Sequence, residues 1–166
     1  MFTLRHLTLI STYKMETIIK GGNLMLFLDK ASIPLATSHT MRISSDTVDV
    51  SNKDVASGKW AASEIGKFSW EVTTDNLYCD TGIETLYDYM LAAEPIDALF
   101  FQKDEDDDDE LPQSGSWTPS TTKKGFSGKV LITSLDITAQ NGDNATFSAT
   151  FTGYGELSYG TYTSNP

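Results

Sequence analysis

The sequence predicts a mainly β protein with about seven strands, one peripheral helix and long loops. Residues 145–152 alternate strictly between apolar and hydroxyl side chains, which is the pattern of a strand with one buried face. A second alternating segment surrounds Trp70, and Asn141-Gly142 supplies a hairpin turn between two strand patterns. Only the segment after Cys79 repeats its apolar residues at helical spacing. These features together favour a β domain over an α or α/β fold.

The length of 166 residues fits one domain. We assign it to residues 15–166 and interpret residues 1–14 as an N-terminal arm or as an extension upstream of a start at Met15. The longest apolar run, residues 24–28, is far shorter than the ~20 residues of a membrane span. No secretory cleavage pattern is evident. The single Cys79 excludes an internal disulfide framework and is compatible with a reducing cytoplasm.

The net charge of −11 argues against tight binding of nucleic acid. Proteins that hold DNA or RNA gather Lys and Arg on one surface to displace counterions from phosphate. This chain has Arg5 and Arg42 as its only arginines, and residues 104–110 are all acidic. We interpret the acidic run as a solvated loop tip, since it lacks the glycine and the spaced final Glu of a calcium-binding EF-hand loop.

The first half of the domain predicts two strand regions and a long loop. Residues 18–28 read as a strand buried on both faces or nearly so, and residues 32–44 as a second. Val48 and Val50 alternate in the opposite phase to Met41 and Ile43, which indicates a bulge around residues 44–46. The aperiodic residues 51–66 predict a functional loop, and Trp60 lies within it.

Residues 67–75 return to alternation, with apolar side chains inward and polar ones outward. The inward set is Phe68, Trp70 and Val72, and the outward set is Ser69, Glu71 and Thr73. Thr81 and Glu84 then have the spacing of a helix capping box. An apolar stripe follows at helical spacing, made of Ile83, Leu86, Tyr87, Met90 and Leu91. Pro95 ends this predicted helix.

Three strands close the domain: residues 96–102, residues 128–139 and the alternating residues 145–152. The last of these has an apolar face formed by Ala145, Phe147, Ala149 and Phe151, and a hydroxyl face formed by Thr146, Ser148, Thr150 and Thr152. It contains no Lys or Pro, the residues that usually protect an exposed sheet edge. We therefore expect an unprotected edge here that a partner strand completes.

No set of residues predicts catalysis, a metal site or a cofactor. His6 and His39 have no Cys or His partner at metal-ligand spacing. Glu71 and Asp75 could form a glycosidase-like carboxylate pair, but solvated acids on an outward strand face are the better interpretation. We therefore expect a protein that is not an enzyme.

Three stretches, in this order along the chain, carry a resemblance to a known family: "TIIKGGNLMLFLDKASIPLATSHTMRISSDTVDVSNKD", "GKWAASEIGKFSWEVTTDNLY" and "GKVLITSLDITAQNGDNATFSATFTGYGEL". Over residues 15–157 the chain resembles the major tail tube protein of long-tailed bacteriophages, in the family typified by lactococcal siphophages. It is similar to versions from phages and prophages of Bacteroides and relatives. The closing "FTGYGEL" is the most specific part. Residues 1–14 and the acidic run depart from the family pattern.

The resemblance implies a β-sandwich or split barrel of two packed sheets with one flanking helix. It also implies that six copies close into a ring and that rings stack into a hollow tube in the virion tail, assembled in the host cytoplasm. DNA would pass through the lumen without specific binding. The implied partners are other copies of the chain and the tape measure, tail terminator and distal tail proteins. We expect contacts between subunits or rings at Val55, Trp60 and the hydroxyl residues Thr146, Ser148, Thr150 and Thr152.

Two other functions remain open at this point. The inner tube of a contractile tail or injection system has a related fold. A non-catalytic β-sandwich module that binds carbohydrate would also be acidic, alternating and rich in loops, with Trp60 and Trp117 as candidate aromatics. A hydrolase is a third and weaker alternative.

Overall fold

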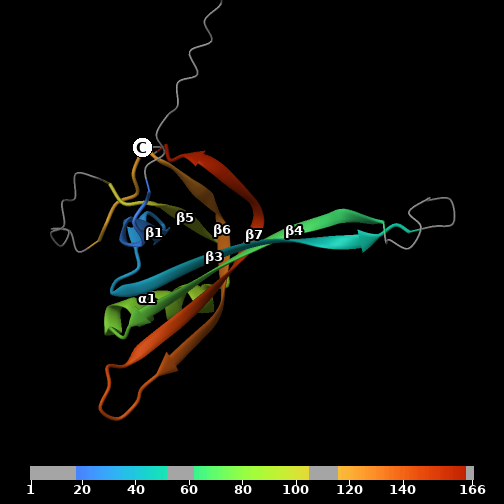
Figure 1. Cartoon of the computed structure of the whole chain (residues 1–166). Coiled ribbons are helices and arrows are strands. Elements are labelled where there is room, and N and C mark those ends of the chain that lie inside the picture. Colours follow the sequence, from blue (N-terminus) through green and yellow to red (C-terminus); the bar gives the residue numbers. More distant parts are fainter. Residues whose placement is uncertain (1–17, 52–61, 105–115, 164–166) are drawn as a thin grey trace, which may run out of the picture.

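The computed structural model describes residues 18–51, 62–104 and 116–163. Within these ranges seven strands form one antiparallel sheet in the order β2-β1-β5-β6-β7-β4-β3 (Figure 1). The elements are η1 (Gly21–Asn23), β1 (Leu24–Leu28), β2 (Ala31–Ser32), β3 (Ala36–Asp49), β4 (Ser63–Leu77), α1 (Asp80–Ala92), β5 (Ile96–Gln102), β6 (Lys124–Thr138) and β7 (Thr146–Thr161). The predicted mainly β fold with one helix is confirmed.

The sheet curls so that its two halves enclose the larger of two buried hydrophobic clusters. β6 and β7 run through both halves, and their register shifts twice: β7 carries extra residues opposite Ser127 and Lys129, and β6 carries one extra residue between Ile132 and Ser134. As a result Leu26 of β1 and Val72 of β4, from opposite sides of the sheet order, belong to the same buried cluster. The layers are therefore sandwich-like, and they belong to one continuous sheet.

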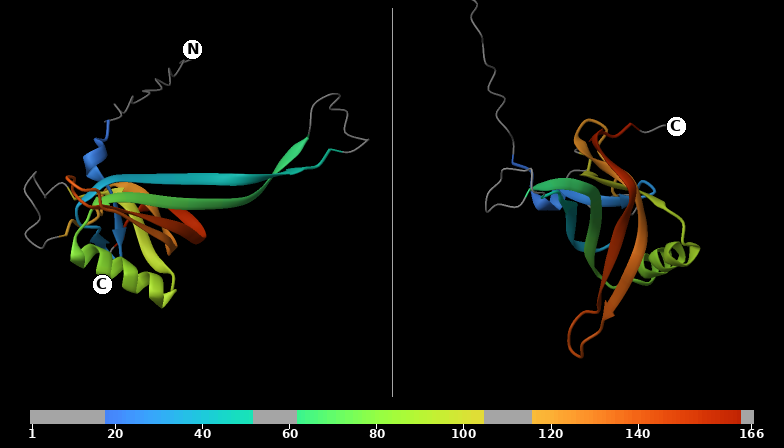
Figure 2. Two further views of the ribbon diagram at one scale, coloured as in Figure 1. Left: turned by 90° about the horizontal axis from the view of Figure 1, so that it is seen from below. Right: turned by 90° about the vertical axis from the view of Figure 1, so that its right-hand side faces the viewer.

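The sheet forks where β4 leaves β7. The two strands pair from Leu77 and Thr146 as far as Glu71 and Thr152. Beyond that point β4 stays paired with β3, and the two extend away from the body as a long hairpin (Figure 2). At Gly153, the first residue of β7 past this pairing, the chain bends away from the hairpin.

Trp70 fills the base of the fork. Its indole lies against the backbone of Gly128 and Gly153, and its Nε1 donates a hydrogen bond to the carbonyl oxygen of Gly155 at 3.2 Å. A Cβ atom at Gly153 would overlap the indole ring, and one at Gly128 would lie 2.7 Å from it. Gly155 has a φ of +80°, which favours glycine. The glycines of the "FTGYGEL" stretch therefore allow β7 to bend around this tryptophan.

The hairpin accounts for two differences from the sequence prediction. β4 begins at Ser63, so residues 63–66 are strand rather than part of a long loop. Phe68 has the orientation predicted for it but is 73% exposed, because it lies past the fork where no opposing layer covers it. The β3–β4 register does shift at the predicted place, between Ser45 and Thr47, but the extra residue lies in β4, because Ser45 pairs with Phe68 and Thr47 pairs with Ile65.

The helix is present, but its start and its buried face differ from the prediction. It begins at Asp80 with Cys79 as N-cap and no side-chain capping bond, so Thr81 lies inside the first turn and the predicted capping box is wrong. Gly82 and Leu86 are buried, whereas Tyr87 and Leu91 are exposed. The buried face of the helix is rotated relative to the predicted one because Gly82 packs closely against Pro34 and Cys79.

β7 is not an edge strand, contrary to our expectation. Residues 146–152 pair with β6 on one side and with β4 on the other. Among the described residues the free edges of this part of the sheet are β3 and residues 131–138 of β6, because β5 pairs with β6 only from Phe126 to Val130. Unpaired edges therefore exist, but on other strands.

Candidate functional site: a hydroxyl-rich sheet face

Four adjoining strand segments present one face that points away from the core. We call it the hydroxyl face. Side chains alternate between the two faces of a strand, so the residues that alternate with the buried ones point to this face, and most of them carry a hydroxyl group. The buried residues are Val72, Thr74, Phe147 and Ala149. The residues of the hydroxyl face are Ser38, Thr40, Arg42 and Ser44 of β3; Ser69, Glu71, Thr73 and Asp75 of β4; Thr146, Ser148, Thr150 and Thr152 of β7; and Thr133, Ser134, Asp136 and Thr138 of β6, with Leu131 beside them.

The hydroxyl groups of this face bond to their neighbours across the strands. Ser44 and Ser69 lie 2.9 Å apart through their Oγ atoms, and Thr133 Oγ1 lies 3.2 Å from Thr152 Oγ1. Ser38 donates to the Asp75 carboxylate at 2.7 Å. Such a face remains wettable without presenting free cations, and it can also pack closely against another surface.

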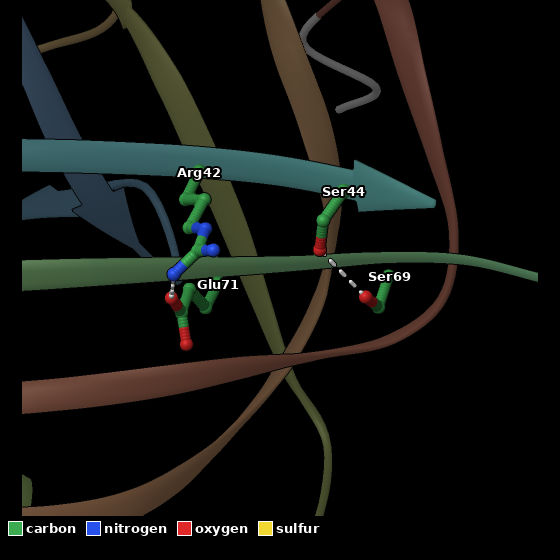
Figure 3. A network of polar contacts seen from close by, with 4 residues as sticks. All are labelled: Arg42, Ser44, Ser69 and Glu71. Atoms are coloured by element: carbon green, nitrogen blue, oxygen red, sulfur yellow. Dashed lines mark hydrogen bonds and ion pairs between the residues drawn. The ribbon is translucent and has the colours of Figure 1, made fainter. Parts of the chain in front are cut away.

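Charge on the hydroxyl face is sparse and mostly negative. Arg42 is its one basic residue, against the carboxylates of Glu71, Asp75 and Asp136. Arg42 Nη1 lies 3.8 Å from Glu71 Oε1 (Figure 3). The Arg42 side chain is largely exposed and that of Glu71 is about half exposed, so the pair adds little to stability. Its consequence is electrostatic, because the only cation of the face is held beside an anion.

The structure brings four of the six predicted contact residues together. Thr146, Ser148 and Thr150 are half-buried in the middle of the hydroxyl face, and Thr152 is exposed at the fork. Val55 and Trp60 lie outside the described residues, as do residues 105–110 of the acidic run. The first residue of that run is anchored, because the Asp104 N–H donates to the Thr118 carbonyl at 3.0 Å.

The sequence prediction missed the contribution of β3 to this face. Ser38, Thr40, Arg42 and Ser44 alternate with His39, Met41 and Ile43, and this signal was available in "TSHTMRIS". The pairing of Thr40 with Thr73, and of Thr73 with Thr150, extends one row of hydroxyls across three strands. Only the pairing of strands distant in sequence shows that these rows are continuous.

His39 lies on the core side of β3, next to a cavity of about 340 Å³ lined by Gly21, Gly22 and Phe100. Its Nδ1 is buried and has no hydrogen-bond partner among the described residues. Burial lowers the pKa of His39 below its ordinary value of 6.5, and the Asp75 carboxylate offsets part of this effect. Neutral His39 is therefore the form that this position favours.

The lowered pKa of His39 predicts a loss of stability in acid. The unfolded chain binds a proton at His39 more readily than the folded chain does, so the stability of the subunit is unaffected above pH 6.5 and falls as the pH drops from 6.5 through the lower pKa of the folded chain. We expect His39→Gln to reduce the drop in melting temperature between about pH 7.5 and about pH 5.5. Equal drops in the two proteins would contradict this role for His39.

The described residues contain no cluster of three His, Cys, Asp or Glu side chains that could hold a metal ion. Glu71 and Asp75, the carboxylates considered for catalysis, contact Arg42 and Ser38 respectively.

No helix in the described part of the chain is both long enough and apolar enough to cross a membrane.

A family described as "Phage tail tube protein" matches residues 31–159. This range includes β3, β4, α1 and β5 and all of β6, and it includes every residue of the hydroxyl face. No curated protein sequence matches the chain.

Solved structures of tails and injection systems share the fold. One is described as the tail of an empty gene transfer agent particle with C6 symmetry; it has a TM-score of 0.65 and 18% identity over 87% of this chain and 100% of that chain. A sheath-tube complex of the contractile injection system PVC gives a TM-score of 0.61 and 15% identity, over 89% of this chain and 95% of that chain. The SPP1 tail tube gives a TM-score of 0.52 and 12% identity, over 87% of this chain and 80% of that chain.

Proposed function

The chain belongs to the phage tail tube protein family and is a structural subunit of a virion tail; we propose that six copies close into a ring, that rings stack into a tube, and that the hydroxyl face lines the lumen. The observation that carries the proposal is the position of this face between two unpaired sheet edges. The C6 symmetry of a structurally similar tail supports the number six.

Copies join through the free edges of the four-stranded region. β3, β4, β7 and β6 are successively antiparallel, so β3 runs opposite to residues 131–138 of β6. In a ring, β3 of each copy lies beside β6 of the next copy. Because each copy contributes an even number of strands, the antiparallel alternation continues around the ring without interruption. A closed barrel of this kind leaves no exposed edge.

The lumen is suited to passage of DNA rather than to binding it. Each copy presents hydroxyls, three carboxylates and one Arg that is held beside Glu71. A tight DNA-binding surface would need several free Lys or Arg groups to displace counterions from phosphate. A weakly negative wall repels the DNA backbone, so the duplex can slide along it.

The remaining contacts belong to the same proposal. Residues 52–61 connect the two strands of the projecting β3–β4 hairpin, so Val55 and Trp60 are suitably placed in the sequence to contact a neighbouring ring. Residues 15–166 belong to the single tube domain, with residues 1–14 as an N-terminal arm or an upstream extension. Assembly takes place in the host cytoplasm, with tape measure, terminator and distal tail proteins completing the tail.

An inner tube of a contractile system is a second candidate. The similarity to the PVC sheath-tube complex supports it, since that complex shares the fold to nearly the same degree as the gene transfer agent tail. A sheath gene next to the gene for this chain would favour the contractile system. Its absence would favour a non-contractile tail.

Thr150→Lys tests the lumen assignment. Thr150 lies on β7, which is paired on both sides and is not itself an edge, so the variant subunit should fold and assemble. Its tubes should retain short duplex DNA in sedimentation, with a retention that falls as salt rises. Wild-type tubes and Thr150→Gln tubes should retain none. If Thr150→Lys tubes also retain none, this face does not line the lumen.

A further inference from the structure

We propose that Arg42 of one copy forms an ion pair with Asp136 of the next copy, and that this pair sets the register of the junction between β3 and β6. The inference rests on the proposed function, because it requires copies arranged in a ring. It adds the identity of the two side chains that recognise each other there.

Arg42 is placed to reach a second carboxylate. It lies on the edge strand β3 and on the hydroxyl face, and its side chain is 73% exposed. Its described contact within the copy is the 3.8 Å approach to Glu71 (Figure 3), which leaves most of its five N–H donors unused. A guanidinium can engage two carboxylates at once, which a lysine ammonium does with less geometric definition.

Asp136 occupies the matching position on the opposite edge. It pairs in register with Ser148, and Ser148 pairs with Asp75, so Asp136 and Arg42 lie on the same face of the sheet. Ser134 donates a 3.3 Å hydrogen bond to its carboxylate. No basic side chain among the described residues lies within ion-pair distance of Asp136. The two edges are therefore complementary in charge.

The other side of the same two edge strands is complementary in apolar surface. Ile43 of β3 is 50% exposed and Ile137 of β6 is 56% exposed, although both point to the core side. Their register partners Trp70 and Phe147 are buried in that core. When β3 of one copy meets β6 of the next, exposed apolar side chains come together on the side away from the lumen. Their burial favours association.

The ion pair distinguishes one strand register from another, which the rows of hydroxyl groups do not. A slip by two residues along β3 or β6 keeps each side chain on its own face and exchanges one hydroxyl for another. Backbone pairing and Ser/Thr contacts would therefore tolerate several registers. Arg42 is the one Lys or Arg of β3, and Asp136 is the one charged residue within residues 131–138 of β6, so only one register brings them together.

Charge reversal with rescue tests the pairing. All variants are made in a Glu71→Gln background, which removes the partner of Arg42 within its own copy and should itself assemble. We expect Arg42→Asp and Asp136→Arg each to raise the protein concentration needed for tube formation about tenfold or more, because like charges then face each other. The double variant should restore assembly. Melting temperatures of the unassembled subunits should stay close to that of the background.

The outcomes separate this inference from the proposed function. If the wild-type protein forms no rings or tubes, the proposed function fails. If it does, but either single variant assembles at the background concentration, the ion pair is wrong. Failure of the double variant to assemble, with both singles impaired, would also overturn it.

Discussion

Replacing Phe147 by alanine is expected to lower the free energy of unfolding by about 3–5 kcal/mol. Phe147 is 2% exposed and lies in the main core cluster with Val72 and Leu86. Truncation removes the buried ring and leaves a cavity that the surrounding strands can fill only in part. Since a domain of this size has about 5–15 kcal/mol in total, this loss is a large fraction of the stability of the subunit.

Phe68→Ala is the matched control for Phe147→Ala. It removes the same ring from a position that is 73% exposed in the subunit. Urea unfolding of the isolated subunit should show a large loss for Phe147→Ala and almost none for Phe68→Ala. Equal losses would mean that the buried and exposed parts of the sheet are wrongly assigned.

Replacing Gly153 by alanine should destabilise the subunit by about 1–3 kcal/mol, because the new methyl group overlaps the Trp70 indole. The indole is rigid, buried and hydrogen-bonded to Gly155, so it has little room to move. Its displacement should also change the near-ultraviolet circular dichroism of the subunit.

Gly160→Ala provides the control on the same strand. A Cβ atom at Gly160 would have no neighbour within 4 Å, so this variant should retain wild-type stability and spectrum. If Gly153→Ala proves as stable as Gly160→Ala, the close packing of Trp70 against β7 is refuted.

The sequence predicted those elements whose pattern is local. The alternation of residues 145–152 placed Phe147, Ala149 and Phe151 in the core, and all three are buried. The phase change between Ile43 and Val48 indicated an irregularity at this point, and the β3–β4 register shifts there, although the extra residue lies in β4. Each of these depends on neighbouring residues alone, so no knowledge of the partner strand was needed.

The features that failed depend on pairing between distant segments. Phe68 has the right orientation for burial but lies past the fork, which results from the packing of Trp70 against Gly128 and Gly153. β7 resembled an edge by composition, yet it lies between β6 and β4. The helix kept its length but not its predicted face, because Gly82 approaches Pro34 closely.

The same reason limited the prediction of the site. The hydroxyls of residues 146–152 were found because they alternate within one strand. Arg42 and Asp136 were not recognised as a pair, since they lie on opposite edges of the sheet and their relation requires the order of the strands.

Electron cryomicroscopy of the wild-type protein at high concentration will show whether β3 and β6 of neighbouring copies join. We expect stacked rings in which β3 of each copy adjoins residues 131–138 of β6 of the next, with Thr73, Thr150 and Ser134 facing the lumen. Tubes with these residues on the outer surface, or a protein that remains monomeric at every concentration, would contradict this expectation.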